Sequence, residues 1–275
     1  MLECRRCGTG RTAPRPSERE IGHFYPPDYE SFTARAAVRG SLFRGLKAIA
    51  QGPALLRYGR PSLPTPPSAG ARALEIGSGA GDHLAALAEA GWEVTGVEPD
   101  ERAAAQATAR FPILRERVAV ERAELVSFLN GSFELVVMEH VLEHLHEPHA
   151  VLDRVRGWLR DGGTLQLWLP NFSSLERRVF GSYWYGLDVP RHLNHFTERA
   201  VRTVLAARGF TVTSAVPEIQ ASTLAGSVRH VLDAVLHRRR VEPAGPGLYY
   251  LLTPLAATLQ ALGNRPTIVV TAIAT

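Results

Sequence analysis

Apolar and polar positions alternate along the chain with two periods, one typical of buried strands and one typical of amphipathic helices. The short apolar runs predict strands at Ala73 to Ile76, Glu93 to Val97, Val118 to Val120, Phe133 to Met138, Thr164 to Leu169, Phe210 to Val216 and Thr267 to Ile273. The longer periodic stretches predict helices at Asp82 to Ala90, Asp100 to Phe111, Pro148 to Leu159 and Thr197 to Arg208, with a mostly helical insertion at residues 222–262. Such alternation implies an α/β fold with a doubly wound parallel sheet that is covered by helices on both faces.

The first seventy residues lack this alternation and end in a Pro-rich loop at Arg60 to Pro67, which excludes a helix interior or a central strand. We therefore place a boundary there. Residues 1–70 form an N-terminal segment, in which Val38 to Leu56 is expected to be a covering helix, and residues 71–275 form the main domain.

Composition and charge narrow the class of protein. With 45% hydrophobic and 21% charged residues, the 275-residue chain is an ordinary globular protein. The net charge of +4 comes from scattered basic residues apart from Arg238 to Arg240, so no nucleic-acid partner is expected. The apolar stretch Leu248 to Leu262 is too short for a membrane span, and the N-terminus does not resemble a signal peptide, so a cytoplasmic location is expected.

Two cysteines, Cys4 and Cys7, have the spacing of thiolate zinc ligands. A closed structural zinc site needs four ligands, and the next candidate, His23, lies well away in the sequence. We expect free thiols rather than bound zinc.

The strongest chemical signal is a glycine-rich turn between the first predicted strand of the main domain and the helix after it. Gly77, Ser78, Gly79 and Gly81 follow Glu75 and Ile76 directly. Glycines let backbone N–H groups approach a ligand closely, and the helix N-terminus that follows favours a negative group. A carboxylate or phosphate is expected to bind at this turn.

The spacing of the glycines, together with the acidic residue at the end of the next strand, indicates which class of ligand binds at the turn. A dinucleotide fingerprint places its third glycine three positions after the second, whereas Gly81 comes two after Gly79 and Asp82 occupies the other position. Glu98 ends the next strand, where its carboxylate can accept hydrogen bonds from both hydroxyls of a ribose. The pattern predicts a nucleoside and disfavours a pyrophosphate.

These motifs resemble those of class I S-adenosylmethionine-dependent methyltransferases: Leu74 to Gly81 is similar to the first motif, Gly96 to Pro99 to the ribose-binding motif, and Leu159 to Gly163 to the turn before the fifth strand. The resemblance implies a Rossmann-like, seven-stranded, mostly parallel sheet with an antiparallel last strand. It implies S-adenosylmethionine as cofactor, and as binding residues Glu75, Gly77, Ser78, Gly79, Gly81, Glu98, Pro99, Glu124 and Glu139, with Ala123 as the alternative to Glu124 beside the adenine.

The segment Phe133 to His149 is similar to that of ubiquinone-biosynthesis O-methyltransferases. The N-terminus resembles their sugar-modifying relatives with a zinc ribbon of two Cys pairs, of which only the second pair matches, as Cys4 and Cys7, followed by the similar stretch Pro14 to Tyr29. In the ubiquinone enzymes, a cluster like His140, Glu143 and His144 is thought to bind a divalent cation, but His140 stands where they tend to have Glu. The same residues read as an inverted zinc-protease signature, although that motif belongs inside a long helix. We expect no required metal here.

A polar and aromatic cluster follows the fifth predicted strand, at the sheet edge where α/β proteins bind ligands. Trp184 and Tyr185 are candidates for an apolar wall of an acceptor site. His192 and His195 are candidate general bases, since an imidazole titrates near neutral pH, and His140 is a third candidate catalytic residue. The alternative is that these polar side chains only pin the loop by hydrogen bonds.

The sequence therefore predicts direct in-line methyl transfer to a small-molecule acceptor, a sugar or sugar nucleotide first and a phenolic hydroxyl second. Two alternatives stay open: a protein that binds the nucleoside cofactor without methylating, and an NAD(P)-dependent reductase. The sequence does not indicate the oligomeric state.

Overall fold

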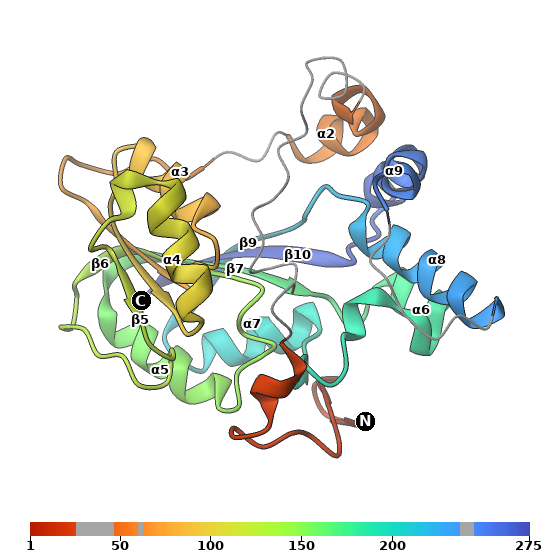
Figure 1. Cartoon of the computed structure of the whole chain (residues 1–275), viewed down its shortest axis with the longest axis horizontal. Coiled ribbons are helices and arrows are strands. Elements are labelled where there is room, and N and C mark those ends of the chain that lie inside the picture. Colours follow the sequence, from red (N-terminus) through yellow and green to blue (C-terminus); the bar gives the residue numbers. More distant parts are fainter. Residues whose placement is uncertain (26–46, 60–62, 237–244) are drawn as a thin grey trace.

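A seven-stranded sheet forms the centre of the molecule in the computed structural model, which describes residues 1–25, 47–59, 63–236 and 245–275 (Figure 1). The strand order is β5-β4-β3-β6-β7-β10-β9. Neighbouring strands from β5 to β7 run parallel, whereas β10 is antiparallel to both β7 and β9. The bounds are β3 (Arg72–Ile76), β4 (Glu93–Glu98), β5 (Val118–Val120), β6 (Phe133–Glu139), β7 (Leu159–Pro170), β9 (Phe210–Pro217) and β10 (Thr267–Ala274). The predicted Rossmann-like sheet is confirmed.

Alternate residues of β6 pack on opposite faces of this sheet, which shows why the strand is apolar throughout. Leu135 and Val137 face a core that includes α3 (Asp82–Glu89) and α4 (Glu101–Arg110). Val136 and Met138 face the other core, which α5 (Pro148–Trp158) and α7 (Glu198–Ala206) cover. Because both faces are buried, polar positions are excluded from the strand interior, as expected for a doubly wound sheet.

Helix starts follow local capping chemistry. The Asp100 side chain accepts hydrogen bonds from the backbone N–H groups of Arg102 and Ala103 and begins α4, and Thr197 caps α7 in the same way through Ala200. Most of the predicted helices and strands agree with the structure to within two residues at either end. The exception is the turn expected at Asp161 to Gly163, which lies inside β7 because Leu159 already pairs with Phe133.

The N-terminal residues pair with a segment of the main domain far along the chain, which the sequence did not indicate. The strands β1 (Leu2–Glu3), β2 (Gly10–Arg11) and β8 (Asn194–His195) form a second, antiparallel sheet in the order β1-β2-β8. The first part of the covering helix expected at Val38 to Leu56, up to residue 46, lies outside the described residues; in the described part, residues 47–50 and α2 (Gly52–Tyr58) are helical.

Helices α2, α6 (Leu175–Phe180), α8 (Ser222–Val235) and α9 (Pro246–Ala261) form a layer beyond one end of the sheet, called the four-helix layer below (Figure 1). Successive members touch, since α6 packs on α8, α8 on α9 and α9 on α2. The predicted insertion at residues 222–262 is thus two helices, whereas α6 was not predicted. In the described residues, no helix has the length and apolarity that crossing a membrane requires.

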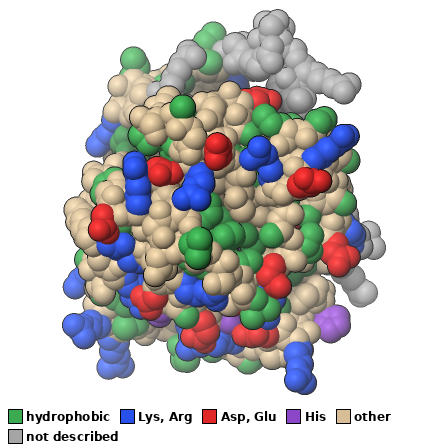
Figure 2. Space-filling view, turned by 90° about the vertical axis from the view of Figure 1, so that its left-hand side faces the viewer, with side chains coloured by type: hydrophobic (Ala, Val, Ile, Leu, Met, Phe, Trp, Pro, Cys, Tyr) green, Lys and Arg blue, Asp and Glu red, His purple; other side chains and the backbone are tan. Residues whose placement is uncertain are grey.

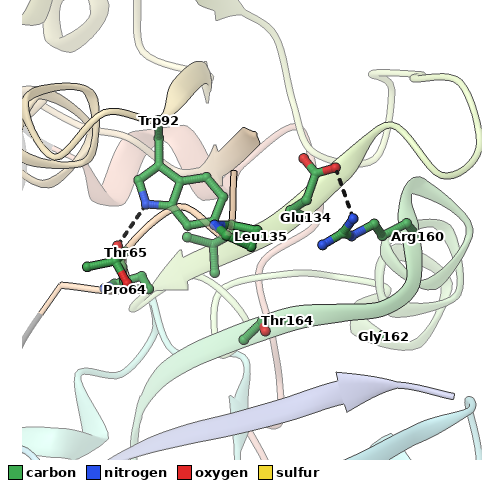
Figure 3. A pocket seen from close by; sticks show the side chains of 9 residues that line it. Pro64, Thr65, Trp92, Glu134, Leu135, Arg160, Gly162 and Thr164 are labelled. Carbon is green, nitrogen blue, oxygen red and sulfur yellow. Dashed lines mark hydrogen bonds and ion pairs between the residues drawn. The ribbon is translucent and has the colours of Figure 1, made fainter. Parts of the chain in front are cut away.

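A cavity of about 180 Å³ lies between the Pro-rich loop and the strands β6 and β7 (Figure 3). Trp92 donates its indole N–H to the carbonyl of Pro64 at 2.7 Å, and Glu134 lies 3.7 Å from Arg160. Glu134 is the second residue of β6, so this cavity lies at the amino end of that strand and away from the glycine turn, which follows the carboxyl end of β3.

Candidate functional site

The glycine turn between β3 and α3 has a backbone that only glycine adopts without strain. Gly77, Gly79 and Gly81 have φ values of 73°, 51° and 82°. A Cβ at Gly77 would lie 2.4 Å from Val141 Cγ2, and one at Gly81 would lie 2.7 Å from Ala107 Cβ. The glycines therefore let the turn pack against the segment after β6 on one side and against α4 on the other.

Glu98 joins the glycine turn to the start of α4. Its Oε2 accepts a hydrogen bond from the backbone N–H of Gly79 at 2.8 Å, and its Oε1 accepts one from Asp100 at 3.0 Å. The side chain is buried; burial raises its pKa, whereas the two hydrogen bonds lower it. Each carboxylate oxygen can accept a further hydrogen bond, so the two acceptors fit the two hydroxyl donors of a ribose.

A cluster of two carboxylates and an imidazole lies beside the turn, with Glu75 buried and His83 and Glu139 half-buried. Glu75 Oε1 is 3.1 Å from His83 Nδ1, and Glu75, His83 and Glu139 each place one ligand atom within 4.8 Å of the others. Trp168 packs edge-on against His83. Two carboxylates suit a cationic ammonium group, which fits the methionine end of the predicted cofactor. His83 and Trp168 were not anticipated, although His83 stands in the first turn of the helix after the glycines.

The remaining predicted cofactor residues lie around this turn in different environments. The hydroxyl of Ser78 is buried and has no hydrogen-bond partner among the described residues, and Pro99 is exposed. Glu124 is half-buried and pairs with Arg122 at 3.6 Å. These positions neither strengthen nor exclude the predicted contacts with the adenosine.

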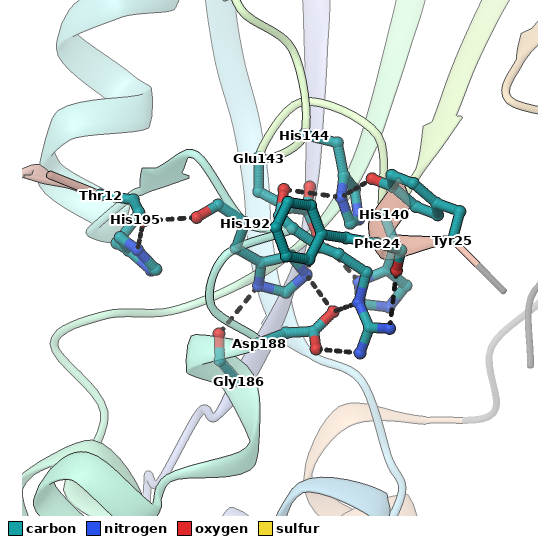
Figure 4. A network of polar contacts seen from close by, with 11 residues as sticks. Thr12, Phe24, Tyr25, His140, Glu143, His144, Gly186, Asp188, His192 and His195 are labelled. Carbon is teal, nitrogen blue, oxygen red and sulfur yellow. Dashed lines mark hydrogen bonds and ion pairs between the residues drawn. The ribbon is translucent and has the colours of Figure 1, made fainter. Parts of the chain in front are cut away.

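A second polar cluster follows β6 and contains the predicted residues His140, Glu143, His144 and His192 (Figure 4). His140 Nδ1 lies 3.2 Å from Glu143 Oε1, and its Nε2 lies 3.7 Å from Glu218 Oε2. Burial alone would lower the pKa of His140, but both carboxylates raise it well above its usual value. His140 is therefore a cation and a hydrogen-bond donor near neutral pH.

Glu143 is the anionic centre of the cluster. The carboxyl is only 1% exposed. Burial raises its pKa, but the hydrogen bond and charge of His140 outweigh burial and lower it to about 2. Its Oε1 also lies 4.0 Å from His192 Nε2. Glu143, His144 and His192 each bring one ligand atom within 4.8 Å of the others, so these three are the group on this side that could hold a cation.

The imidazole of His192 contacts a backbone carbonyl through Nδ1, whereas its Nε2 faces carboxylates. Its Nδ1 lies 3.0 Å from the carbonyl oxygen of Gly186, which can only accept, so Nδ1 carries the proton. Nε2 is then a lone-pair acceptor that faces Asp188 Oδ2 at 3.8 Å as well as Glu143. A carboxylate beside such a nitrogen stabilises the imidazolium that forms when it takes up a proton.

His144 and His195 are tied to the N-terminal residues. His144 Nδ1 lies 2.8 Å from the hydroxyl of Tyr25, and His195 Nε2 lies 3.0 Å from the hydroxyl of Thr12 (Figure 4). Burial is the main cause that lowers the pKa of each imidazole to about 4, and the charge of His192 adds to it. Both are neutral at physiological pH. Tyr25, Thr12 and Glu218 were missed, because a short strand and two loop ends give no periodic signal.

The segment between Gly181 and His195 packs as a unit over this cluster. Trp184 is 1% exposed and forms a small core with Phe172 and Leu187. Tyr185 lies against His230 of α8. Trp184 therefore holds the segment together from within, whereas the sequence suggested a wall of the acceptor site.

Comparisons with known proteins agree with the geometry. Residues 49–215 match a family model described as a methyltransferase domain. A ubiquinone biosynthesis O-methyltransferase of Xanthomonas campestris pv. campestris is 30% identical over 145 residues, which are 50% of this chain and 60% of that protein. An uncharacterized 37.1 kDa protein in transposon TN4556 of Streptomyces fradiae is 28% identical over 64% of this chain and 54% of its own length. The chain thus spans less than two thirds of these relatives.

Solved structures share the fold at low sequence identity. A putative S-adenosylmethionine-dependent methyltransferase from Listeria monocytogenes superposes with a TM-score of 0.52 at 17% identity, covering 84% of this chain and 99% of that one. A putative methyltransferase from Haloferax volcanii, in complex with the Trm112 activator, gives a TM-score of 0.54 at 15% identity, covering 84% and 95%. The family model, the glycine turn and the acidic strand end agree: the chain belongs to the S-adenosylmethionine-dependent methyltransferase family.

Proposed function

We propose that the protein transfers the methyl group of S-adenosylmethionine directly to a hydroxyl of a small molecule, a phenolic compound or a sugar or sugar nucleotide. The observation that carries this proposal is His192, whose Nε2 is an available proton acceptor next to two carboxylates. The name of the ubiquinone biosynthesis relatives supports a phenolic acceptor, and the likeness of the N-terminus to sugar-modifying relatives supports a sugar.

The proposed site has a cofactor side and an acceptor side, and different residues of the chain act on each. On the cofactor side, Glu98 would hold the ribose, while Glu75 and Glu139 would hold the ammonium group. When bound, the cofactor supplies an electrophilic methyl group on a sulfonium. The chain orients the acceptor in line with that group and keeps water away.

On the acceptor side, His192 would take the hydroxyl proton, and Glu143 with Asp188 would stabilise the resulting imidazolium. His140, already protonated, would donate a hydrogen bond to the acceptor. His195 offers the same chemistry, but its Nε2 is engaged by Thr12, so we assign the base to His192 and a positioning role to His195. Glu143, His144 and His192 fit a divalent cation, but this mechanism does not require one.

Calorimetric titration with S-adenosylhomocysteine and, in parallel, with NADH tests the cofactor side. We expect S-adenosylhomocysteine to bind and NADH not to bind. A screen of phenolic and sugar acceptors, read out as formation of S-adenosylhomocysteine, then tests transfer. Cofactor binding with no methylation of either acceptor class would favour the protein that binds the cofactor without catalysis.

A further inference from the structure

The outer surface of the four-helix layer exposes large apolar side chains. Among the described residues, half of the exposed large hydrophobic side chains lie on or next to these helices, including Leu56, Leu251 and Leu262, which are 91%, 74% and 77% exposed. The inner surface of the same layer is packed, because Leu224 and Ala256 form a buried cluster with Phe180. The layer therefore packs against itself through a buried apolar cluster and also exposes large apolar side chains to solvent.

Helix α9 shows the pattern most clearly. Its exposed positions include Leu251, Pro254, Leu255 and Thr258, and the exposed Leu262 follows directly after the helix, so that spacings of three and four residues recur. These spacings place them on one side of the helix, while Ala256, Ala257 and Gln260 face inward and are buried. No residue of α9 carries a charge. An uncharged stripe of this length is unusual on a surface that only water covers.

The charged side chains that the four-helix layer exposes are all basic. Among the residues of α2, α6, α8 and α9, the acidic side chains are Glu176 and Asp233, which are 3% and 2% exposed. Asp233 is paired with Arg229 at 2.8 Å. The exposed charged residues on these helices are basic, Arg57 and Arg178. The face of the molecule in Figure 2, which is the left-hand side of Figure 1, instead intersperses acidic and basic side chains.

We infer that this apolar and basic face of the four-helix layer binds peripherally to the surface of an anionic lipid bilayer. Leucines on one side of a helix enter the boundary between headgroups and acyl chains, and arginines attract anionic headgroups. A second copy of the chain is less suited to the face, because a symmetric contact would bring its basic side chains against one another without acidic partners.

Membrane binding would place the proposed acceptor side next to the lipid. Helix α8 carries the segment that covers the second polar cluster, since Ser227 Oγ accepts a hydrogen bond from the backbone N–H of Tyr185 at 2.9 Å. His230 Nδ1 lies 3.2 Å from the carbonyl oxygen of Tyr183. An amphiphilic acceptor could then reach the site from the membrane, although lipid binding itself does not depend on the proposed methylation.

Sedimentation of the 275-residue chain with vesicles tests this inference. We expect binding to vesicles that contain phosphatidylglycerol, weaker binding to phosphatidylcholine alone, and weakening by added salt. The double variant Leu251→Glu, Leu255→Glu should bind about tenfold more weakly or worse. Its control is Leu125→Glu, Leu129→Glu, which changes leucines that are 62% and 83% exposed outside the layer and should bind like the unmodified chain.

Three results would overturn the inference. The chain does not sediment with anionic vesicles, or both double variants bind as well as the unmodified chain, or light scattering without lipid shows a dimer that only the α9 variant dissociates. Circular dichroism and calorimetry with S-adenosylhomocysteine verify that the α9 variant remains folded, so loss of lipid binding is not confused with loss of structure or of the cofactor site.

Discussion

Thr12 donates its hydroxyl to the carbonyl oxygen of His192 at 2.6 Å, across 180 positions of sequence. The same hydroxyl lies 3.0 Å from His195 Nε2, and the neighbouring strands β2 and β8 pair. The N-terminal residues thus fix the backbone on which both candidate histidines stand. They therefore pack against the proposed acceptor side, although they precede the glycine turn by more than sixty residues.

Replacing Thr12 by Val tests this link. The change keeps the size of the side chain but removes a buried hydroxyl, leaving a carbonyl and an imidazole without their partner. We expect a loss of about 1 to 3 kcal/mol in the free energy of unfolding, measured by chemical denaturation. Affinity for S-adenosylhomocysteine should not change, because the cofactor contacts lie on other elements. An unchanged stability would show that the N-terminal pairing contributes little.

Glu98→Ala should weaken the binding of S-adenosylhomocysteine by about 1 to 3 kcal/mol in calorimetry, the scale of lost hydrogen bonds to a charged group. The variant loses the predicted ribose contacts and also the acceptor for the N–H of Gly79. Glu93→Ala, at the exposed start of the same strand, is the control. Equal affinities for the two variants would exclude Glu98 from the cofactor site.

Substitutions of His192 and His195 should have different effects, one on the methylation rate and the other on stability. His192→Ala should reduce methylation by about two to four powers of ten, the span of a lost general base, with unchanged cofactor affinity. His195→Ala should mainly reduce stability, because that imidazole is 3% exposed and bonded to Thr12. Rates on an identified acceptor and denaturation curves measure the two effects. A normal rate for His192→Ala would reduce this residue to a role in pinning the loop.

A metal chelator should leave the affinity for S-adenosylhomocysteine intact, because the glycine turn offers backbone donors rather than metal ligands. Calorimetry before and after treatment with EDTA measures this. Loss of affinity would instead assign a cation to Glu75, His83 and Glu139, the group of possible ligands beside the turn.

The sequence predicted the sheet correctly, and it could suggest residues for the cofactor side, because both signals are local. The glycines at Gly77 to Gly81 and the acidic end of β4 lie within one βαβ unit, where order along the chain determines order in space. The acceptor side combines Tyr25, Glu143, His192 and Glu218, which come from four distant segments. Their proximity depends on tertiary packing, so neither periodicity nor spacing could reveal it. His83 is an intermediate case, since it follows the glycines but only the structure shows it bonded to Glu75.

Glu176 is a buried carboxyl of the four-helix layer, and its Oε1 accepts a hydrogen bond from Asn264 at 3.1 Å. Burial raises its pKa from 4.5 to about 7. The folded state therefore holds this proton more tightly than the unfolded state does. The resulting stability is complete below pH 4.5 and is lost as the pH rises through 7, by about 1.4 kcal/mol for each pH unit between these two values.

Glu176→Gln cannot ionise and keeps an acceptor for Asn264, so its stability should not fall over that window. We expect the variant to be more stable than the unmodified chain at about pH 8, and the advantage to shrink or reverse at pH 4.5, as measured by chemical denaturation at both values. Histidines with lowered pKa, such as His195, act in the opposite direction below pH 6.5, but they are common to both proteins and cancel in the difference. A difference in stability that does not change with pH would show that folding does not raise the pKa of Glu176.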